Sequence, residues 1–296
     1  MYSLSVPCSL FPVPSTKYTI YFARLLNLVL FVNKTMTYWY QGKLINSQTL
    51  ELNINDPGLL YGATVFTTLR VYNYSLDNYL TNWDAHCSRL KFSLQTFGWT
   101  EPNWNCVYEG AKVLLQQYPV LRITIFPDGR ELILGRSLPG NLTHKQEHGI
   151  VAAISEPQFV RSLPNHKTGN YLSAWLAKNT VPAEEAILVD DQGNWLETST
   201  GNLWGWQNGC WWTPPLAVGI LPGIERSHII TNLHNHQANL KQYPWTPELV
   251  NTFEAIAYTN SVVEIIPIHT VKQPHGSLQY NPYHSCFLEL KGLFVA

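Results

Sequence analysis

Hydrophobic and polar residues in the first half of the chain follow patterns that predict strands and helices. Residues 65–71 are β-branched and aromatic, which favours a strand. Residues 121–126 and 131–134 flank the turn Pro127-Asp128-Gly129 and predict a hairpin. Between these strands, apolar residues recur at spacings of three and four, as in an amphipathic helix with one face on a core: Leu80, Trp83, Cys87, Leu90, Leu94 and Phe97.

The second half of the chain carries a further series of elements. We expect strands near residues 150–154, 186–189, 203–206 and 255–259, and helices near residues 170–178, from residue 224 and near residues 284–293. Residues 137–145 are rich in Pro, Gly, Asn and polar residues and lack a hydrophobic period, so we place a domain boundary there. The sequence therefore predicts an α/β fold of two domains: a small domain (36–137), a linker (138–146) and a larger domain (147–296).

The first 35 residues differ from the rest of the chain. Residues 18–32 are mostly apolar, but Arg24 and Asn27 interrupt them, so the segment is too short and too polar for a membrane span. Met36 precedes an aromatic stretch with a turn signal, residues 37–43, which is a natural beginning for a folded domain. We expect residues 1–35 to be a dispensable extension that is disordered or an over-extended start.

Composition narrows the class of partner. Charged residues make up 13% of the chain and the formal net charge is -1, so neither a basic face for nucleic acid nor an acidic tail is indicated. The five cysteines are odd in number, scattered and free of any C-x-x-C spacing, which is typical of a reducing compartment. We expect a cytoplasmic protein that binds a small molecule rather than nucleic acid or a membrane.

Two ionisable residues of the second domain are candidates for chemistry. Lys167 lies between a loop and a predicted helix, where a partly desolvated lysine loses its proton readily and attacks a carbonyl. The alternative is an ordinary solvated lysine. Glu197 follows a turn and precedes a predicted strand; it could be the acid partner that a pyridine nitrogen needs, or a solvated turn glutamate.

Other segments offer contacts for an anion. The loop of residues 219–223 leads into a predicted helix, and such junctions direct free backbone N–H groups and a positive helix end at a phosphate, although most are simply turns. Arg89 follows His86 by three on a helix and can bind a phosphate with both guanidinium arms, or lie exposed. Thr259-Asn260-Ser261 ends a buried-looking strand, where polar residues also cap turns.

Metal and nucleophile motifs are weaker. His234 and His236 have no third ligand nearby in sequence, and neither H-E-x-x-H nor a cysteine pair occurs, so we expect no metal site. The chain also lacks a G-x-S-x-G elbow and a phosphate-binding P-loop.

The order of these segments resembles that of the class IV pyridoxal-phosphate aminotransferases. The resemblance rests on residues 56–71 (DPGLLYGATVFTTLRV), His86-x-x-Arg89-Leu90, Lys167-x-x-Asn170, and residues 197–202, 219–226 and 259–261, and it runs from about Tyr38 to the C-terminus. It implies the fold-type IV, D-amino acid aminotransferase-like architecture: two α/β domains with the cofactor in the cleft between them, usually in a homodimer.

The resemblance also implies roles for individual residues. By position, Lys167 looks like the Schiff-base lysine and proton carrier, Glu197 like the partner of the pyridine nitrogen, and Arg89 like the phosphate clamp. The remaining matches in cofactor-binding segments are Asn202, Leu221, Gly223, Ile224, Thr259, Asn260 and Ser261. Residues expected to face the amino substrate are Tyr61, Thr68 and Arg130.

Three details of the motifs favour 4-amino-4-deoxychorismate lyase within this family. Phe66-Thr67-Thr68 is similar to the lyase version, where aminotransferases more often carry glutamate after the phenylalanine. Asn170 follows Lys167 by three, and Thr259-Asn260-Ser261 replaces the Thr-Gly-Thr of branched-chain enzymes. The resemblance thus implies release of pyruvate and 4-aminobenzoate, as in folate synthesis. An aminotransferase of branched-chain or D-amino acids and a non-catalytic binding homologue are the alternatives.

Two positions depart from the family pattern. Glu225 stands where many aminotransferases place a threonine hydroxyl on the phosphate, and a carboxylate there repels that anion unless it turns away. Residues 126–130 replace an Arg-Gly-rich segment of many lyases, which leaves Arg130 as a candidate donor to a substrate carboxylate.

Overall fold

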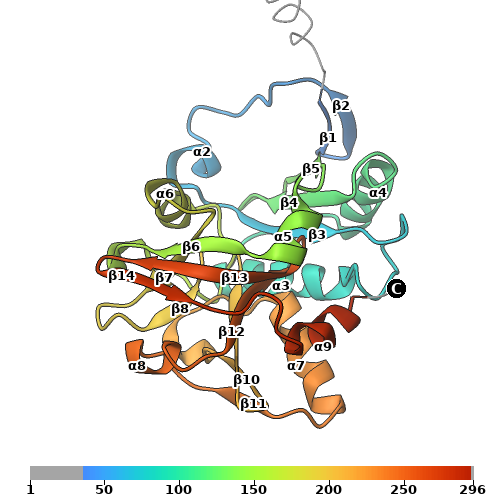
Figure 1. Cartoon of the computed structure of the whole chain (residues 1–296). Helices are drawn as coiled ribbons and strands as arrows, with labels where there is room; N and C mark the ends of the chain where they lie inside the picture. Colours follow the sequence, from blue (N-terminus) through green and yellow to red (C-terminus); the bar gives the residue numbers. More distant parts are fainter. Residues whose placement is uncertain (1–35, 295–296) are drawn as a thin grey trace, which may run out of the picture.

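The computed structural model describes residues 36–294, which form two β-sheets with helices packed against them (Figure 1). The predicted α/β fold is confirmed, whereas the prediction for residues 1–35 lies outside the described residues. The domain boundary stays a prediction, and the segment expected as a linker contains a short helix, α5 (Leu142–His148).

The smaller sheet belongs to the first part of the chain and is antiparallel throughout. Its strand order is β2-β1-β5-β4-β3. The bounds are Thr37–Tyr40 (β1), Lys43–Asn46 (β2), Val65–Arg70 (β3), Val120–Ile125 (β4) and Glu131–Arg136 (β5). Two helices, α3 (Trp83–Phe97) and α4 (Trp104–Leu114), share a core with this sheet. The short helix α2 (Pro57–Tyr61) precedes β3.

The larger sheet contains the other nine strands. Its main path is β11-β10-β9-β12-β13-β6-β7-β8, and β14 pairs with β13. The bounds are Ile150–Ile154 (β6), Glu185–Val189 (β7), Trp195–Thr198 (β8), Asn202–Gln207 (β9), Cys210–Thr213 (β10), Leu240–Gln242 (β11), Ala255–Asn260 (β12), Glu264–Gln273 (β13) and Gly276–Gln279 (β14).

Helices of the second part of the chain pack around this sheet. They are α6 (Leu172–Thr180), α7 (Ile224–Asn235), α8 (Pro247–Val250) and α9 (Cys286–Gly292), with 3₁₀ turns at Pro157–Phe159 and Leu216–Val218. One core joins β6, β7, β12 and β13, and a second joins α7 and α9 to β9, β10 and β12. Both cores contain residues of β9 and β12, and the ends of these two strands carry side chains of the candidate site.

Most predicted elements are present, with shifted ends. The helix expected from residue 80 begins at Trp83, because residues 76–82 form turns. The helix expected from residue 170 begins at Leu172. Glu197 follows the turn at residues 190–194 and precedes β9, as predicted, but it also lies inside a short strand of its own, β8, which was not predicted. The ten-residue strand β13 was not predicted.

The two sheets are joined close to Lys167. Its carbonyl accepts a hydrogen bond of 2.8 Å from the N–H of Phe66 on β3, and the N–H of Gly169 donates to Thr64 at 2.7 Å. Thr168 also forms an isolated bridge with Val65. The loop before α6 is therefore paired with the edge of the smaller sheet, which places Lys167 where the two sheets meet.

Candidate active site

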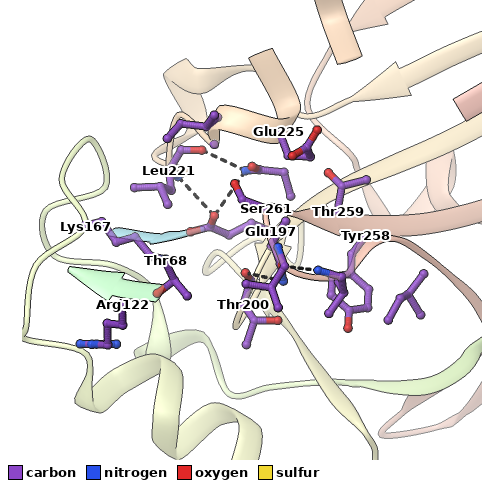
Figure 2. Close-up of a pocket in the computed structure, with 18 of the residues that line it drawn as sticks. Thr68, Arg122, Lys167, Glu197, Thr200, Leu221, Glu225, Tyr258, Thr259 and Ser261 are labelled. Atoms are coloured by element: carbon purple, nitrogen blue, oxygen red, sulfur yellow. Dashed lines mark hydrogen bonds between the residues drawn. The ribbon is translucent and has the colours of Figure 1, made fainter. Parts of the chain in front are cut away.

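A cavity of about 420 Å³ lies where the two sheets meet, and Lys167 lines it. Its wall comes from β3 and β4 of the smaller sheet, from the ends of β8, β9 and β12 of the larger sheet, and from the start of α7. Figure 2 shows Lys167, Glu197, Thr259 and Ser261 around this space. Segments far apart in sequence thus converge on one cavity.

The environment of Lys167 favours its neutral amine. Burial lowers the pKa of Lys167 well below its ordinary value, and the positive charges of Arg161, Arg89 and Arg122 lower it further. The charge of Glu197 acts in the opposite sense but does not outweigh them. A neutral amine can attack a carbonyl and can accept a proton.

Several hydrogen-bond donors hold the side chain of Glu197 in place. Arg161 donates from Nε to Oε1 at 2.6 Å, and this ion pair is almost fully buried. The backbone N–H of Leu221 approaches Oε2 at 3.3 Å, and Nδ2 of Asn202 lies 3.5 Å from the same oxygen. Because a buried carboxyl group needs hydrogen-bond donors, these contacts fix the position of the Glu197 side chain along the cavity wall.

Tyr171 closes the side of the cavity next to Lys167. Its hydroxyl donates to the carbonyl of Ser199 at 2.5 Å, and its ring centre lies 5.4 Å from Nζ of Lys167. Burial raises the pKa of the Tyr171 hydroxyl, which therefore stays protonated as a donor. The ring of Phe66 lies on another side of the amine, with its centre 5.0 Å from Nζ.

The start of α7 presents unpaired backbone donors to the cavity. Gly223 is the residue before the first helical turn and no side chain caps it. A Cβ added to Gly223 would lie 2.0 Å from Oδ1 of Asn202, so only glycine fits there. Asn202 in turn donates to the carbonyl of Leu221 at 2.9 Å. The first turn of this 12-residue helix has backbone N–H groups that no side chain caps, which makes it a suitable binding site for a phosphate group.

Arg89 adds a guanidinium that has no acidic partner among the described residues. Its Nη2 donates to the hydroxyl of Thr67 at 2.8 Å, while its Nε is buried without any hydrogen-bond partner. Thr67 also hydrogen-bonds Nδ1 of His86, whose pKa is well below its ordinary value because of burial and the nearby charge of Arg89. A neutral His86 and Thr67 thus hold Arg89 in place, with donors left for an anion.

The loop after β12 forms another part of the wall. Nδ2 of Asn260 donates to the carbonyl of Thr200 at 3.2 Å, and its Oδ1 accepts from the N–H groups of Val262 and Val263. Thr259 accepts a hydrogen bond from the indole of Trp204 at 3.0 Å. Asn260 therefore fixes two loops, and it lines the cavity together with Thr259 and Ser261.

Two further arginines line the cavity without an acidic partner among residues 36–294. Arg122 on β4 stacks over the ring of Phe66 at 3.5 Å, and burial together with the charge of Arg136 lowers its pKa to about 10. Arg136, at the end of β5, is exposed and no ion pair occupies its guanidinium. Two like charges close together on one wall make it a favourable surface for an anion.

The structure brings most residues that the sequence singled out to this cavity. These are Thr68, Arg89, Lys167, Glu197, Asn202, Leu221, Gly223, Ile224, Thr259, Asn260 and Ser261. Two are not brought there. Tyr61 is 74% exposed on α2, and Arg130 lies outside the cavity wall, where it binds Asp56 at 2.5 Å and Asp128 at 2.6 Å.

Sequence reasoning missed several lining residues. Arg161 and Tyr171 flank Lys167 at distances of six and four residues, but no periodicity or turn signal marks them. Arg122 alternates with apolar residues on β4 as any solvent-facing strand residue does. Only the packing of the two sheets reveals that all three face one cavity.

Neither a metal cluster nor a membrane-crossing helix is found in the described part of the chain. Residues 36–294 contain no group of three or more His, Cys, Asp or Glu side chains placed to hold a metal ion. None of the helices among these residues has the length and apolar character needed to cross a bilayer.

Comparison with known proteins places this arrangement in context. The sequence model of the family described as amino-transferase class IV matches residues 64–271. The aminodeoxychorismate lyase of Bacillus subtilis is 26% identical over 265 residues, covering 79% of this chain and 86% of the relative. The branched-chain-amino-acid aminotransferase of Escherichia coli K12 is 22% identical over 261 residues, covering 79% and 84%.

Solved structures agree in fold. The crystal structure of the Escherichia coli branched-chain amino acid aminotransferase superposes with a TM-score of 0.74 at 20% sequence identity. The match covers 87% of this chain and 93% of that one. At this identity the likeness establishes the fold.

Proposed function

Because the chain belongs to the class IV aminotransferase family of pyridoxal-phosphate enzymes, we propose that it is a 4-amino-4-deoxychorismate lyase that releases pyruvate and 4-aminobenzoate. Membership of the family makes it an enzyme with that cofactor. The choice of reaction and the roles of single residues are the proposal.

The residues around the cavity fit the cofactor. Nε of Arg89 is buried without a partner, which suits a group that accepts hydrogen bonds from it. A Cβ at Gly223 or Gly201 would overlap Asn202 or the carbonyl of Thr259, so glycine at both positions lets these segments pack closely where they line the cavity. We assign the phosphate to Arg89 and the start of α7, the ring nitrogen to Glu197 and the aldehyde carbon to Lys167.

When bound, pyridoxal phosphate provides a sink for the electron pair left on the substrate carbon next to the amino group. Glu197, paired with Arg161, holds a proton on the ring nitrogen and so maintains that sink. Lys167, neutral because of burial and its arginine neighbours, accepts the proton from the substrate carbon. Tyr171 and Phe66 cover the amine and exclude water from it.

The arginine pair Arg122 and Arg136 is the observation that favours the lyase. 4-Amino-4-deoxychorismate carries two carboxylates, one on the ring and one on the enolpyruvyl group, and both arginines line the cavity with Lys167. A branched-chain amino acid carries one carboxylate and an apolar side chain, so it leaves a second unpaired arginine unused. A dicarboxylic keto acid is the other kind of ligand that two arginines fit, and it would serve an aminotransferase as the amino-group acceptor. We therefore propose that these arginines bind the two carboxylates.

An aminotransferase reaction is the second candidate, since branched-chain-amino-acid aminotransferases are among the relatives. Both reactions begin with proton removal by Lys167. In the lyase, Lys167 would pass the proton to the departing enolpyruvyl group, which would leave as pyruvate. In an aminotransferase, Lys167 would give the proton back, the amino group would stay with the cofactor and a keto acid would be released. The fate of that proton separates the two.

The test is to supply the purified holoenzyme with 4-amino-4-deoxychorismate and no keto acid. The lyase proposal requires 4-aminobenzoate and pyruvate in equal amounts over many turnovers. Turnover only after a keto acid is added would contradict the lyase and support the aminotransferase.

We also propose that the enzyme is a cytoplasmic homodimer. Exposed apolar side chains gather on α2 and α6, which lie close together because Gly62 packs against Gly169. They are Leu59, Leu60, Tyr61, Leu172 and Trp175, each more than half exposed. A second copy covering this surface would bury them and bring Tyr61 to an interface. The four described cysteines are free thiols, as expected in a reducing compartment.

A further inference from the structure

Glu225 places a carboxylate at the same helix end that offers its N–H groups to an anion. It is the second residue of α7, its side chain is 5% exposed, and it lines the cavity that contains Lys167. Figure 2 shows its carboxylate among the side chains around the pocket. A carboxylate and a doubly charged phosphate at one helix end repel each other, and burial strengthens that repulsion.

The groups that face Glu225 do not neutralise it with a fixed charge. Within α7, Nδ1 of His228 lies 3.1 Å from its Oε1. Across from α7, Tyr72 has its pKa raised by burial, by Glu264 and by Glu225 itself. Arg70, the cation near Tyr72, is already bound to Glu264 at 2.7 Å. No described lysine or arginine forms an ion pair with Glu225.

A simple charge balance shows the conflict. The positive groups that the proposed function assigns to the phosphate are the Arg89 guanidinium and the helix end, which is equivalent to about +0.5 charge, whereas Arg122 and Arg136 of the same cavity are assigned to the substrate. A doubly charged phosphate together with ionised Glu225 would bring about three negative charges to the helix end. A proton shared between the phosphate and the carboxylate removes one of these charges and turns the repulsion into a hydrogen bond.

We propose that Glu225 makes the site select the singly charged form of a phosphomonoester, whose remaining O–H donates a hydrogen bond to the Glu225 carboxylate. This rests on the cofactor site of the proposed function. Because the second pKa of a phosphomonoester is about 6, binding above neutral pH takes up one proton from solvent. Affinity then falls about tenfold for each pH unit above that pKa.

The experiment uses pyridoxine 5′-phosphate, which carries the ring and the phosphate but no aldehyde and so cannot react with Lys167. Calorimetric titration of the apoenzyme at pH 8 in two buffers of different ionisation enthalpy gives the number of protons taken up. We expect about one more proton in the wild type than in Glu225→Gln, and an affinity at least tenfold higher in that variant at pH 8. Glu264→Gln, a nearby carboxylate outside the cavity wall, is the matched control and keeps the wild-type uptake.

Three results would overturn the inference. Equal proton uptake in the wild type and in Glu225→Gln would show that Glu225 shares no proton with the phosphate. Uptake that is lost in His228→Gln but kept in Glu225→Gln would assign the proton to the histidine. If Glu225→Gln does not fold, the wild-type affinity between pH 7 and pH 9 decides, because a flat profile contradicts the inference. A wild type that does not bind the ligand at all would contradict the proposed function itself.

Discussion

Lys167 owes its chemistry to its surroundings rather than to its local sequence. The described neighbours of its amine are two aromatic rings and several guanidinium groups, which together disfavour the ammonium form. An ordinary surface lysine keeps its proton at neutral pH. The same residue type is therefore made reactive by packing at this position.

The lowered pKa of Lys167 gives a prediction for the stability of the apoenzyme. The folded chain binds fewer protons at Lys167 than the unfolded chain, so wild-type stability increases with pH until the ordinary pKa of 10.5 is reached. Lys167→Met carries no proton there and should be more stable than the wild type at neutral pH. The difference should shrink by about 1.4 kcal/mol for each pH unit as pH rises towards 10.

Urea unfolding of both apoproteins at pH 7, 8 and 9 measures this difference. A difference that stays constant or grows with pH would contradict a neutral Lys167.

Single residues were predictable from the sequence to different degrees. Lys167, Glu197 and Arg89 could be named because they lie beside turns or on a helix face in a family order. Arg161 could not, because its role depends on an ion pair with a residue 36 positions away. Arg130 was singled out from a turn that is in fact held by local acids, Asp56 and Asp128.

Among the elements, the loop that leads into α7 depends most on backbone shape. Gly223→Ala would place a methyl group 2.0 Å from Oδ1 of Asn202, which must then move and release the carbonyl of Leu221. Overpacking of this kind costs about 1–3 kcal/mol, so we expect affinity for pyridoxal phosphate to fall by about 10-fold to 10²-fold.

Fluorescence titration of the apoenzyme measures that affinity. Gly292→Ala is the control, because a Cβ added there meets nothing within 4 Å. Unchanged affinity in Gly223→Ala would show that the loop does not touch the cofactor.

Elements that have a clear local signal in the sequence were predicted well. The apolar spacing of α3 and the turn between β4 and β5 are local signals, and the helix and the hairpin both appear in the structure. Strand β13 was missed because Pro267 interrupts its apolar run. Pairing with β12, β6 and β14, which are distant in sequence or not recognised as strands, stabilises it. Helix α5 was missed because polar residues hide its single buried apolar residue, Leu142.

At the scale of the whole molecule, the cavity exists only because two sheets meet. Pairing of the Lys167 loop with β3 is a contact between segments about 100 residues apart, which no local pattern encodes. The family order of motifs supplied that information for the cofactor site. It did not supply the arginines on β4 and β5, which depend on how the smaller sheet faces the larger one.

The exposed apolar surface of α2 and α6 gives a prediction about assembly. We expect the wild type to have about twice the chain mass of 33.7 kDa in light scattering after size-exclusion chromatography. Trp175→Lys combined with Leu172→Asp should shift it towards the monomer, because charges would enter the interface. Leu288→Lys changes an equally exposed apolar residue on α9 and should leave the mass unchanged. A monomeric wild type would contradict the homodimer.

The most direct test of the central claim is to identify the lysine that holds the cofactor. Borohydride reduction of the holoenzyme makes the link between pyridoxal phosphate and its lysine permanent, and peptide mass spectrometry then locates it. We predict modification of Lys167, loss of that peptide adduct in Lys167→Ala, and no comparable adduct at Lys145 or Lys178, which also line the cavity. An adduct at another lysine in the wild type, or no adduct in protein saturated with cofactor, would contradict it.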